Sequence, residues 1–154
     1  MDLKKVFADP ALLFMTGFGA GLSPMAPGTV GSIIGVVIFL PLLLAPVLVQ
    51  LCFIIAGLAL GIYYSDRVAK KLNAKDPGII VWDEFIGMWI SMLFLPGLIW
   101  LPLAFVLFRF FDIVKPWPIS WADRELKGGF GIMVDDVIAG LMVLLVVQAI
   151  SLML

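Results

Sequence analysis

The sequence predicts an all-α fold: a polytopic membrane helical bundle of about four to five apolar segments, arranged largely as hairpins. Three observations lead to this prediction. Hydrophobic residues make up 63% of the 154-residue chain and the mean hydropathy is +1.17, whereas soluble domains are about half apolar. Several long stretches contain no charged residue. Prolines and glycines divide these stretches into lengths near the ~20 residues of one membrane span. The whole chain, residues 1–154, fits a single integral-membrane domain.

The chain begins with a short polar part, Met1–Pro10, followed by the apolar, glycine-broken part Ala11–Leu22. The second part has the composition of a signal-peptide core, but no small-residue cleavage site of the A-x-A type follows it. We therefore expect a short interfacial or re-entrant helix there.

Residues 17–32 read GFGAGLSPMAPGTVGS, a stretch rich in glycine and proline. This composition indicates irregular backbone that opens into a helix near Thr29. The free N–H groups at such a helix start bind anions well. The alternative is a glycine-rich packing turn. If an anion binds here, the candidates for backbone contacts to it are Gly28, Thr29 and Gly31.

The longest uncharged stretch is Val30–Tyr64, which exceeds the length of one span. Pro41 and Pro46 interrupt it, so we expect a tight hairpin of two membrane helices, Val30–Leu44 and Val47–Tyr64. Glycines four residues apart offer small faces for close helix packing: Gly31 and Gly35, then Gly57 and Gly61.

The next uncharged stretch, Phe85–Phe108, is interrupted at Pro96 and fits either one kinked span or a hairpin of two short helices. A hairpin would return Arg109 to the side of the membrane where Glu84 lies. All ten Lys and Arg residues would then lie on one side, which the positive-inside rule makes the cytoplasmic side. The charge distribution therefore favours the hairpin and five apolar segments, of which Val137–Leu154 is the last.

Two residue types narrow the possible chemistry. Histidine is absent, which excludes phosphohistidine intermediates, histidine general bases and the usual zinc sites. The single cysteine, Cys52, lies in an apolar stretch and is interpreted as a packing residue. With a net charge of only −1 we expect no nucleic-acid partner, and the sequence leaves the oligomeric state open.

Five carboxylates come together at one membrane face in the five-segment topology. Two full charges ~5 Å apart repel by about 3 kcal/mol at an effective dielectric constant near 20, so either the acids disperse over the surface or a cation holds them. Oxygen ligands without histidine suit Mg²⁺, or Mn²⁺, rather than zinc or copper. The candidate catalytic and metal-ligating residues are Asp83, Glu84, Asp112, Asp135 and Asp136.

Basic residues lie on the same face as these acids. Arg109, Asp112 and Lys115 are spaced by three and are expected to share one helical face. Arg109 and Lys115 are candidates to bind phosphate oxygens. Acids, bases and a possible anion site at a lipid surface indicate phosphoryl chemistry on a phospholipid headgroup, without distinguishing hydrolysis from transfer. Asp76 and Asp123 are each as consistent with a turn or surface role as with a ligand role.

Tryptophans flank the polar segments of the chain. Tryptophan is enriched at membrane–water interfaces because its ring is apolar and its N–H is polar. We therefore interpret four of them as interfacial anchors: Trp82, Trp89, Trp117 and Trp121.

Four long motifs in this order resemble the phosphatidylglycerophosphatase A family of bacterial membrane enzymes: GFGAGLSPMAPGTVGS, IVWDEFIGMWIS, FRFFDIVKPWPISWADR and GGFGIMVDDVIAG. The resemblance extends from about Gly17 to Gly140. It implies Mg²⁺-dependent removal of the terminal phosphate of phosphatidylglycerophosphate, giving phosphatidylglycerol. It also implies a bacterial cytoplasmic (inner) membrane. The charge distribution adds the expectation of a multi-pass protein with its active site facing the cytoplasm. One carboxylate would act as a base toward water or as a nucleophile.

Two other functions are compatible with clustered acids in a membrane protein. A metal-dependent phosphatidyltransferase would carry the pattern D-G-x2-A-R-x8-G-x3-D-x3-D, which is not found in this sequence. A small cation transporter would be expected to carry charges within its spans, and the apolar stretches here contain none.

Overall fold

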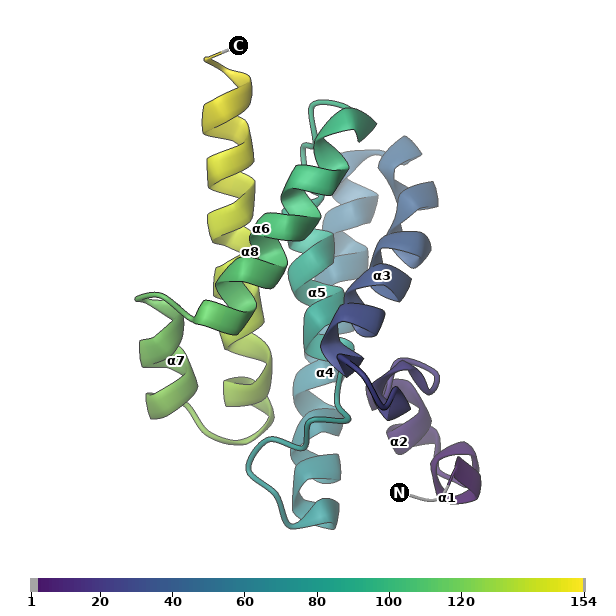
Figure 1. The fold of residues 1–154 in the computed structure, drawn as a ribbon. Coiled ribbons are helices and arrows are strands. Elements are labelled where there is room, and N and C mark those ends of the chain that lie inside the picture. Colours follow the sequence, from purple (N-terminus) through teal and green to yellow (C-terminus); the bar gives the residue numbers. More distant parts are fainter. Residues whose placement is uncertain (1–2, 154) are drawn as a thin grey trace.

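The computed structural model describes residues 3–153, which form helices and connecting turns without any strand (Figure 1). Short helices form the N-terminal part and longer ones form the bundle. In chain order they are α1 (Leu3–Ala8), α2 (Pro10–Met15), η1 (Ala20–Leu22), α3 (Pro27–Phe39), η2 (Leu40–Leu44), α4 (Val47–Leu72), α5 (Trp82–Ser91), η3 (Leu98–Trp100), α6 (Leu101–Val114), α7 (Ile119–Glu125) and α8 (Gly128–Ser151). The predicted all-α fold is confirmed.

Within residues 3–153, three helical segments are long and apolar enough to cross a membrane: Pro27–Leu44, Val47–Leu72 and Gly128–Ser151. Their outward faces carry exposed apolar side chains, among them Ile55 on α4 and Leu145 on α8. Apolar surface of this extent is unfavourable in water and favourable against lipid. The structure is therefore that of a helical membrane protein, as the composition predicts.

The first predicted hairpin is α3–η2 and α4, with its turn at Ala45 and Pro46. Helix α4 extends eight residues beyond the predicted end at Tyr64, to Leu72. The polar continuation supports the helix through an i,i+4 ion pair between Lys70 and Asp66. Helix α4 ends where Asn73 adopts the left-handed conformation (φ 51°).

The stretch predicted as either a hairpin or one kinked span forms a hairpin of two helices, α5 and α6. Helix α5 stops at Ser91, and Phe94 turns the chain with φ 55°. Helix α6 then runs back beside α5 (Figure 1). Arg109 Nη1 thereby comes to 3.9 Å from Glu84 Oε1 at the start of α5. The return of Arg109 to the side of Glu84, predicted from the charge distribution, is confirmed.

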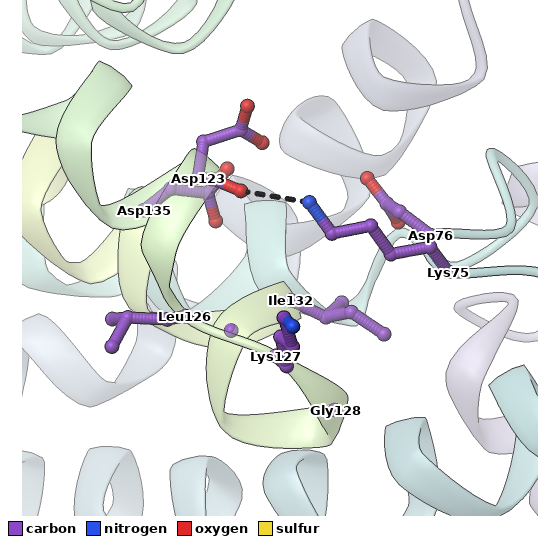
Figure 2. A pocket seen from close by; sticks show the side chains of 9 residues that line it. Lys75, Asp76, Asp123, Leu126, Lys127, Gly128, Ile132 and Asp135 are labelled. Atoms are coloured by element: carbon purple, nitrogen blue, oxygen red, sulfur yellow. Dashed lines mark hydrogen bonds between the residues drawn. The ribbon is translucent and has the colours of Figure 1, made fainter.

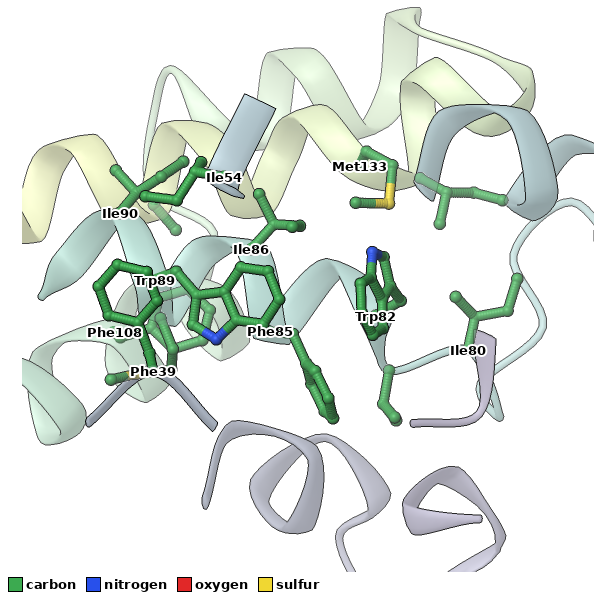
Figure 3. Packing of buried hydrophobic residues seen from close by; sticks show 14 of the residues in the cluster. Phe39, Ile54, Ile80, Trp82, Phe85, Ile86, Trp89, Ile90, Phe108 and Met133 are labelled. Atoms are coloured by element: carbon green, nitrogen blue, oxygen red, sulfur yellow. The ribbon is translucent and has the colours of Figure 1, made fainter. Parts of the chain in front are cut away.

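Helix α5 lies at the centre of the bundle and contacts α3, α4, α6 and α8. Its two tryptophans are buried among other apolar side chains (Figure 3). Trp82 Nε1 donates to Gly57 O at 3.0 Å, and Trp89 Nε1 donates to Gly35 O at 2.8 Å. The prediction that Trp82 and Trp89 are interfacial anchors is therefore wrong. Buried Trp N–H groups need an acceptor, and glycines of the neighbouring helices leave their carbonyls within reach.

The other two tryptophans remain exposed, Trp117 at 77% and Trp121 at 50%. The interpretation of Cys52 as a packing residue is wrong, because its side chain is exposed on α4. The hydrophobicity of a stretch does not distinguish the two faces of a helix when lipid, rather than water, covers the outer one.

The glycine pairs form close-packed faces, as predicted. A Cβ atom on Gly31 would lie 2.8 Å from Val81 Cβ, and one on Gly35 would lie 3.1 Å from the α-carbon of Phe85. A Cβ atom on Gly57 would lie 3.0 Å from the Trp89 ring, and one on Gly61 would lie 2.8 Å from the Trp82 ring. These contacts fix how each helix is rotated about its axis, and thereby which of its side chains point at the others.

The N-terminal part is less continuous than predicted. Instead of one helix over Ala11–Leu22, α2 ends at Met15, and Gly17 and Gly19 adopt positive φ angles before η1. This part is attached to the bundle, since Val81 N–H donates to Met15 O at 3.0 Å. Asp9 Oδ1 caps α2 by accepting from Ala11 N–H, and its other oxygen pairs with Lys71 of α4.

Candidate active site

Three acidic side chains converge between α5 and α8. Asp83 and Glu84 come from the first turn of α5, and Asp136 comes from the third turn of α8. One oxygen from each lies within 4.8 Å of the others. The helices approach this closely because Gly87 and Gly140 face each other: a Cβ atom on Gly140 would lie 2.5 Å from Gly87 O. We call Asp83, Glu84 and Asp136 the acidic triad.

Each residue of the acidic triad has one carboxylate oxygen that is buried from solvent. Asp83 Oδ1, Glu84 Oε2 and Asp136 Oδ2 are buried and have no hydrogen-bond partner within the described residues. Each pair of charges at this spacing repels by about 3 kcal/mol at an effective dielectric constant near 20. Buried, mutually repelling carboxylate oxygens are the arrangement that a divalent cation stabilises, and an all-oxygen set fits Mg²⁺ or Mn²⁺. The residues present therefore fit the expected metal.

Arg109 of α6 lies beside the acidic triad. Its Nη1 is 2.6 Å from Asp112 Oδ2, 3.2 Å from Ser32 Oγ and 3.9 Å from Glu84 Oε1. Its Nε is buried and has no hydrogen-bond partner among the residues that the structure describes. Asp112 thus orients the guanidinium group, which keeps one buried donor available for an anion next to the triad.

Gly28 borders both Arg109 and the triad from the first turn of α3. A Cβ atom at Gly28 would overlap Glu84 Oε1 and lie 3.0 Å from Arg109 Nη2. The close approach of these groups to the α3 backbone therefore requires glycine at this position. Ser32, one turn further along α3, is fully buried, and its hydroxyl donates to Gly28 O at 2.8 Å.

The other two candidate residues on α3 do not face the arginine in this way. Thr29 N–H already donates to Ala26 O at 3.0 Å, within the first turn of α3. Gly31 faces Val81. Ser32 was not identified from the sequence; the signal that points to it is a hydroxyl residue one helical turn beyond Gly28 in a mainly apolar helix.

A second cluster forms around Lys115. Its Nζ donates to Asp123 Oδ1 at 2.7 Å and to Asp135 Oδ2 at 2.6 Å. The prediction that Lys115 shares a helical face with Arg109 and Asp112 is wrong, because α6 ends at Val114 and Lys115 turns away with φ 47°. We call Lys115, Asp123 and Asp135 the lysine cluster.

The charges of the lysine cluster compensate one another. Burial by itself lowers the pKa of Lys115, but the hydrogen bonds to Asp123 and Asp135 outweigh it and raise that pKa above its ordinary value. The hydrogen bond from Lys115 also lowers the pKa of the Asp123 carboxyl. Lys115 and Asp123 are therefore both charged at neutral pH.

A small pocket of about 30 Å³ adjoins the lysine cluster (Figure 2). It lies where the α4–α5 connection meets α7 and the start of α8, and Lys75 Nζ donates to Asp123 O across it at 3.1 Å. Asp76 also lines this pocket, as does Asp135. Of the two acids that the sequence left open, Asp123 thus belongs to the lysine cluster and Asp76 to the rim of this pocket.

The five predicted carboxylates are therefore divided by the fold. Asp83, Glu84 and Asp136 form the acidic triad, Asp112 is paired with Arg109, and Asp135 is paired with Lys115. Within the described residues, three of the five candidate ligands thus have oxygens without a hydrogen-bond partner, and the other two already have a basic partner.

Comparison with known proteins identifies the family. The family model described as Phosphatidylglycerophosphatase A matches residues 13–151. A phosphatidylglycerophosphatase A of Escherichia coli is 43% identical over 86% of this chain and 78% of its own length. One of Haemophilus influenzae is 44% identical over 97% of this chain and 94% of its own length.

A third relative, a putative phosphatidylinositol-3-phosphatase of Bacteroides thetaiotaomicron, is 40% identical over 84% of this chain and 86% of its own length. No solved structure matches the chain significantly. The family model spans residues 13–151, which include every residue of the acidic triad, and each of the two phosphatidylglycerophosphatase A relatives covers more than four fifths of the chain; the chain therefore belongs to the phosphatidylglycerophosphatase A family.

Proposed function

We propose that this protein hydrolyses the terminal phosphomonoester of phosphatidylglycerophosphate to phosphatidylglycerol, using Mg²⁺ or Mn²⁺ held by the acidic triad. The names of two relatives that are 43% and 44% identical support the substrate. The observation that carries the proposal is that, within residues 3–153, the acidic triad has buried oxygens without a hydrogen-bond partner and the neighbouring Arg109 has a buried Nε without one. A phosphate bridging a cation and an arginine satisfies both.

Each residue has a role in this arrangement. Asp83, Glu84 and Asp136 would ligate the cation, which would supply Lewis acidity at the phosphate and lower the pKa of a bound water. Arg109 would donate from Nε to the phosphate and hold the charge that develops on its oxygens. Asp112 and Ser32 orient the guanidinium group, and Gly28 lets Glu84 and Arg109 approach the start of α3 closely.

The overall reaction requires only water. The water oxygen bonds to phosphorus while the bond between phosphorus and the glycerol oxygen breaks, and the glycerol oxygen takes a proton. The products are inorganic phosphate and phosphatidylglycerol. Direct attack by water and attack through an aspartyl-phosphate give the same products.

We further propose that the site faces the cytoplasm of a bacterial inner membrane. The turns at Ala45 and Gly97 carry no charge, and both lie at the end of the bundle opposite the α4–α5 connection and α7 (Figure 1). Cysteines at Ala45 and Gly97, introduced into a Cys52→Ser background, should be labelled only from outside the cell. A cysteine at Lys127 should be labelled only from inside. Labelling of Gly97 and Lys127 positions from one side would contradict this orientation.

Phosphate release by the purified protein in detergent micelles tests the function. Phosphatidylglycerophosphate should yield phosphate, whereas phosphatidylglycerol, a phosphodiester, should not. Exhaustive chelation should abolish the release, and Mg²⁺ should restore it. Phosphatidylinositol 3-phosphate is included because of the name of the third relative, and faster release from it would reassign the substrate.

Other outcomes would reject the proposal. Transfer of a phosphatidyl group without release of phosphate would indicate a phosphatidyltransferase. Absence of any lipid product, together with cation flux into vesicles, would indicate a transporter. Full activity without bound metal would show that the acidic triad does not act through a cation.

A further inference from the structure

We propose that the groove between α3 and α6 seats one acyl chain of the lipid substrate while its phosphate occupies the site at Arg109. This inference rests on the proposed function and adds to it the part of the protein that recognises the substrate as a lipid. The groove encloses about 330 Å³ and is lined only by apolar side chains. They are Ile33, Val36 and Val37 on α3, with Pro102, Phe105 and Val106 among those on α6.

Both walls of the groove continue directly from the phosphate-binding side. On α3, Ile33 follows Ser32, whose hydroxyl is 3.2 Å from Arg109 Nη1. On α6, Phe105 and Val106 precede Arg109 by four and three residues, which puts them on the same face of the helix as the arginine. A headgroup at Arg109 is therefore already at one end of the groove.

The groove leads in the direction that a lipid tail takes. Helix α3 runs away from the site and α6 runs toward it, so the groove extends from the polar end of the bundle toward the uncharged turns (Figure 1). From Arg109 to Leu101 at the far end is eight residues, or ~12 Å at 1.5 Å per residue. A tail of that length stays in the hydrocarbon layer while the phosphate stays at the surface.

The side chains lining the groove are accessible to lipid. Val37 is 60% exposed and Val106 is 63% exposed. Another cavity, of about 420 Å³ and lined by Gln50 as well as by apolar residues, lies at the turns around Ala45 and Gly97. It adjoins neither the acidic triad nor Arg109. A lipid whose phosphate binds at Arg109 would therefore not place its acyl chain there.

Filling the groove tests the inference. Val36→Trp and Val106→Trp each place an indole in it, while Ile55→Trp on α4 and Leu145→Trp on α8 place the same group on other exposed apolar faces. The kcat/KM values are measured for dioleoyl and dihexanoyl phosphatidylglycerophosphate in mixed micelles. The groove variants should lower the preference for the long-chain substrate about tenfold, whereas the controls should keep the parental preference. An unchanged preference in both groove variants would overturn the inference.

Photocrosslinking supplies a readout that does not depend on turnover. A phosphomonoester lipid with a diazirine in one acyl chain is irradiated with the unmodified protein, and the labelled peptides are identified by mass spectrometry. Labelling should concentrate on residues 33–37 and 101–106 and should decrease with excess phosphatidylglycerophosphate but not with phosphatidylcholine. Uniform labelling of α4, α8 and the groove would overturn the inference. Failure of the parent to release phosphate from either substrate, with labelling confined to the groove, would instead reject the proposed function and keep the lipid site.

Discussion

Asp135 and Asp136 are neighbours in the sequence and belong to two different environments in the structure. Asp135 accepts a 2.6 Å hydrogen bond from Lys115 and is part of the lysine cluster. Asp136 points between α5 and α8 at Asp83 and Glu84, and its buried Oδ2 has no hydrogen-bond partner in the described part of the chain. Successive residues of an α-helix point ~100° apart, so one helix serves both regions.

The difference between the two regions lies in the source of positive charge. In the lysine cluster the protein supplies its own cation, Lys115, and the acids there connect α7 and the end of α6 to α8. In the acidic triad Arg109 reaches only Glu84, at 3.9 Å, and is itself held by Asp112 at 2.6 Å. The three acids of the triad therefore share one basic residue, Arg109, which is itself paired more closely with Asp112. We infer that the lysine cluster mainly stabilises the fold, whereas the acidic triad binds a ligand at a cost in stability.

The largest expected effect is on turnover after neutralisation of the acidic triad. Asp136→Asn and Asp83→Asn should each lower kcat by about 100-fold or more, which corresponds to roughly 2.7 kcal/mol of transition-state stabilisation. Neither substitution should lower the melting temperature in detergent, because each also removes repulsion among buried carboxylates. Turnover is measured at saturating Mg²⁺.

The control for this prediction is Asp66→Asn, which removes a carboxylate from an ion pair on α4 outside both regions. It should retain parental turnover. Near-parental turnover of Asp83→Asn or Asp136→Asn would mean that the acid concerned does not take part in the reaction.

A methyl group at Gly28 tests whether the space beside the triad is needed. In Gly28→Ala the added Cβ overlaps Glu84 Oε1 and crowds Arg109 Nη2, so we expect kcat/KM to fall about tenfold or more. Gly78→Ala is the matched control, because a Cβ there meets nothing within 4 Å. Equal activity of the two variants would show that the α3 backbone does not border the reacting phosphate.

Removing Lys115 tests the other region. Lys115→Met leaves the Asp135 carboxylate, which is 8% exposed, without its partner. We expect it to lower the free energy of unfolding by about 2 kcal/mol, near the middle of the range for an unsatisfied buried group. The effect on kcat should be only a few-fold.

The double variant Lys115→Met, Asp135→Asn should recover most of the lost stability, since it leaves no unpaired charge. A loss of kcat in Lys115→Met as large as that in Asp136→Asn, with the melting temperature unchanged, would instead assign Lys115 to the substrate phosphate.

The smallest expected effect is that of Asp123→Asn. Asp123 is 41% exposed, so its ion pair should contribute at most about 1 kcal/mol. Because the hydrogen bond from Lys115 lowers the Asp123 pKa in the folded state, this contribution is present above the carboxyl pKa of the unfolded chain. It is lost as the pH falls through the folded-state pKa. Melting curves of the variant and the parent should therefore differ slightly at pH 7 and converge in acid. A difference that persists in acid would mean that Asp123 acts through packing rather than charge.

The sequence by itself determined the elements and the chemistry available to them. The uncharged stretches, divided by Pro46 and Pro96, had to form membrane helices joined by turns. In lipid only a helix pairs the N–H and C=O groups of such a stretch, and leaving them unpaired costs too much free energy. The absence of histidine restricted any metal to oxygen ligands. The charge distribution also predicted that Arg109 returns to Glu84, since a one-sided arrangement of the basic residues requires a hairpin.

Only the tertiary structure decided which side chains meet. The rotation of each helix about its axis is set by contacts such as Gly87 against Gly140, and these depend on helices far apart in the sequence. That rotation buried Trp82 and Trp89, exposed Cys52, brought Ser32 to Arg109 and separated Asp135 from Asp136. In a lipid environment both faces of these helices are apolar, so hydrophobic periodicity, which reveals the inner face of a helix in a soluble protein, carries little information here.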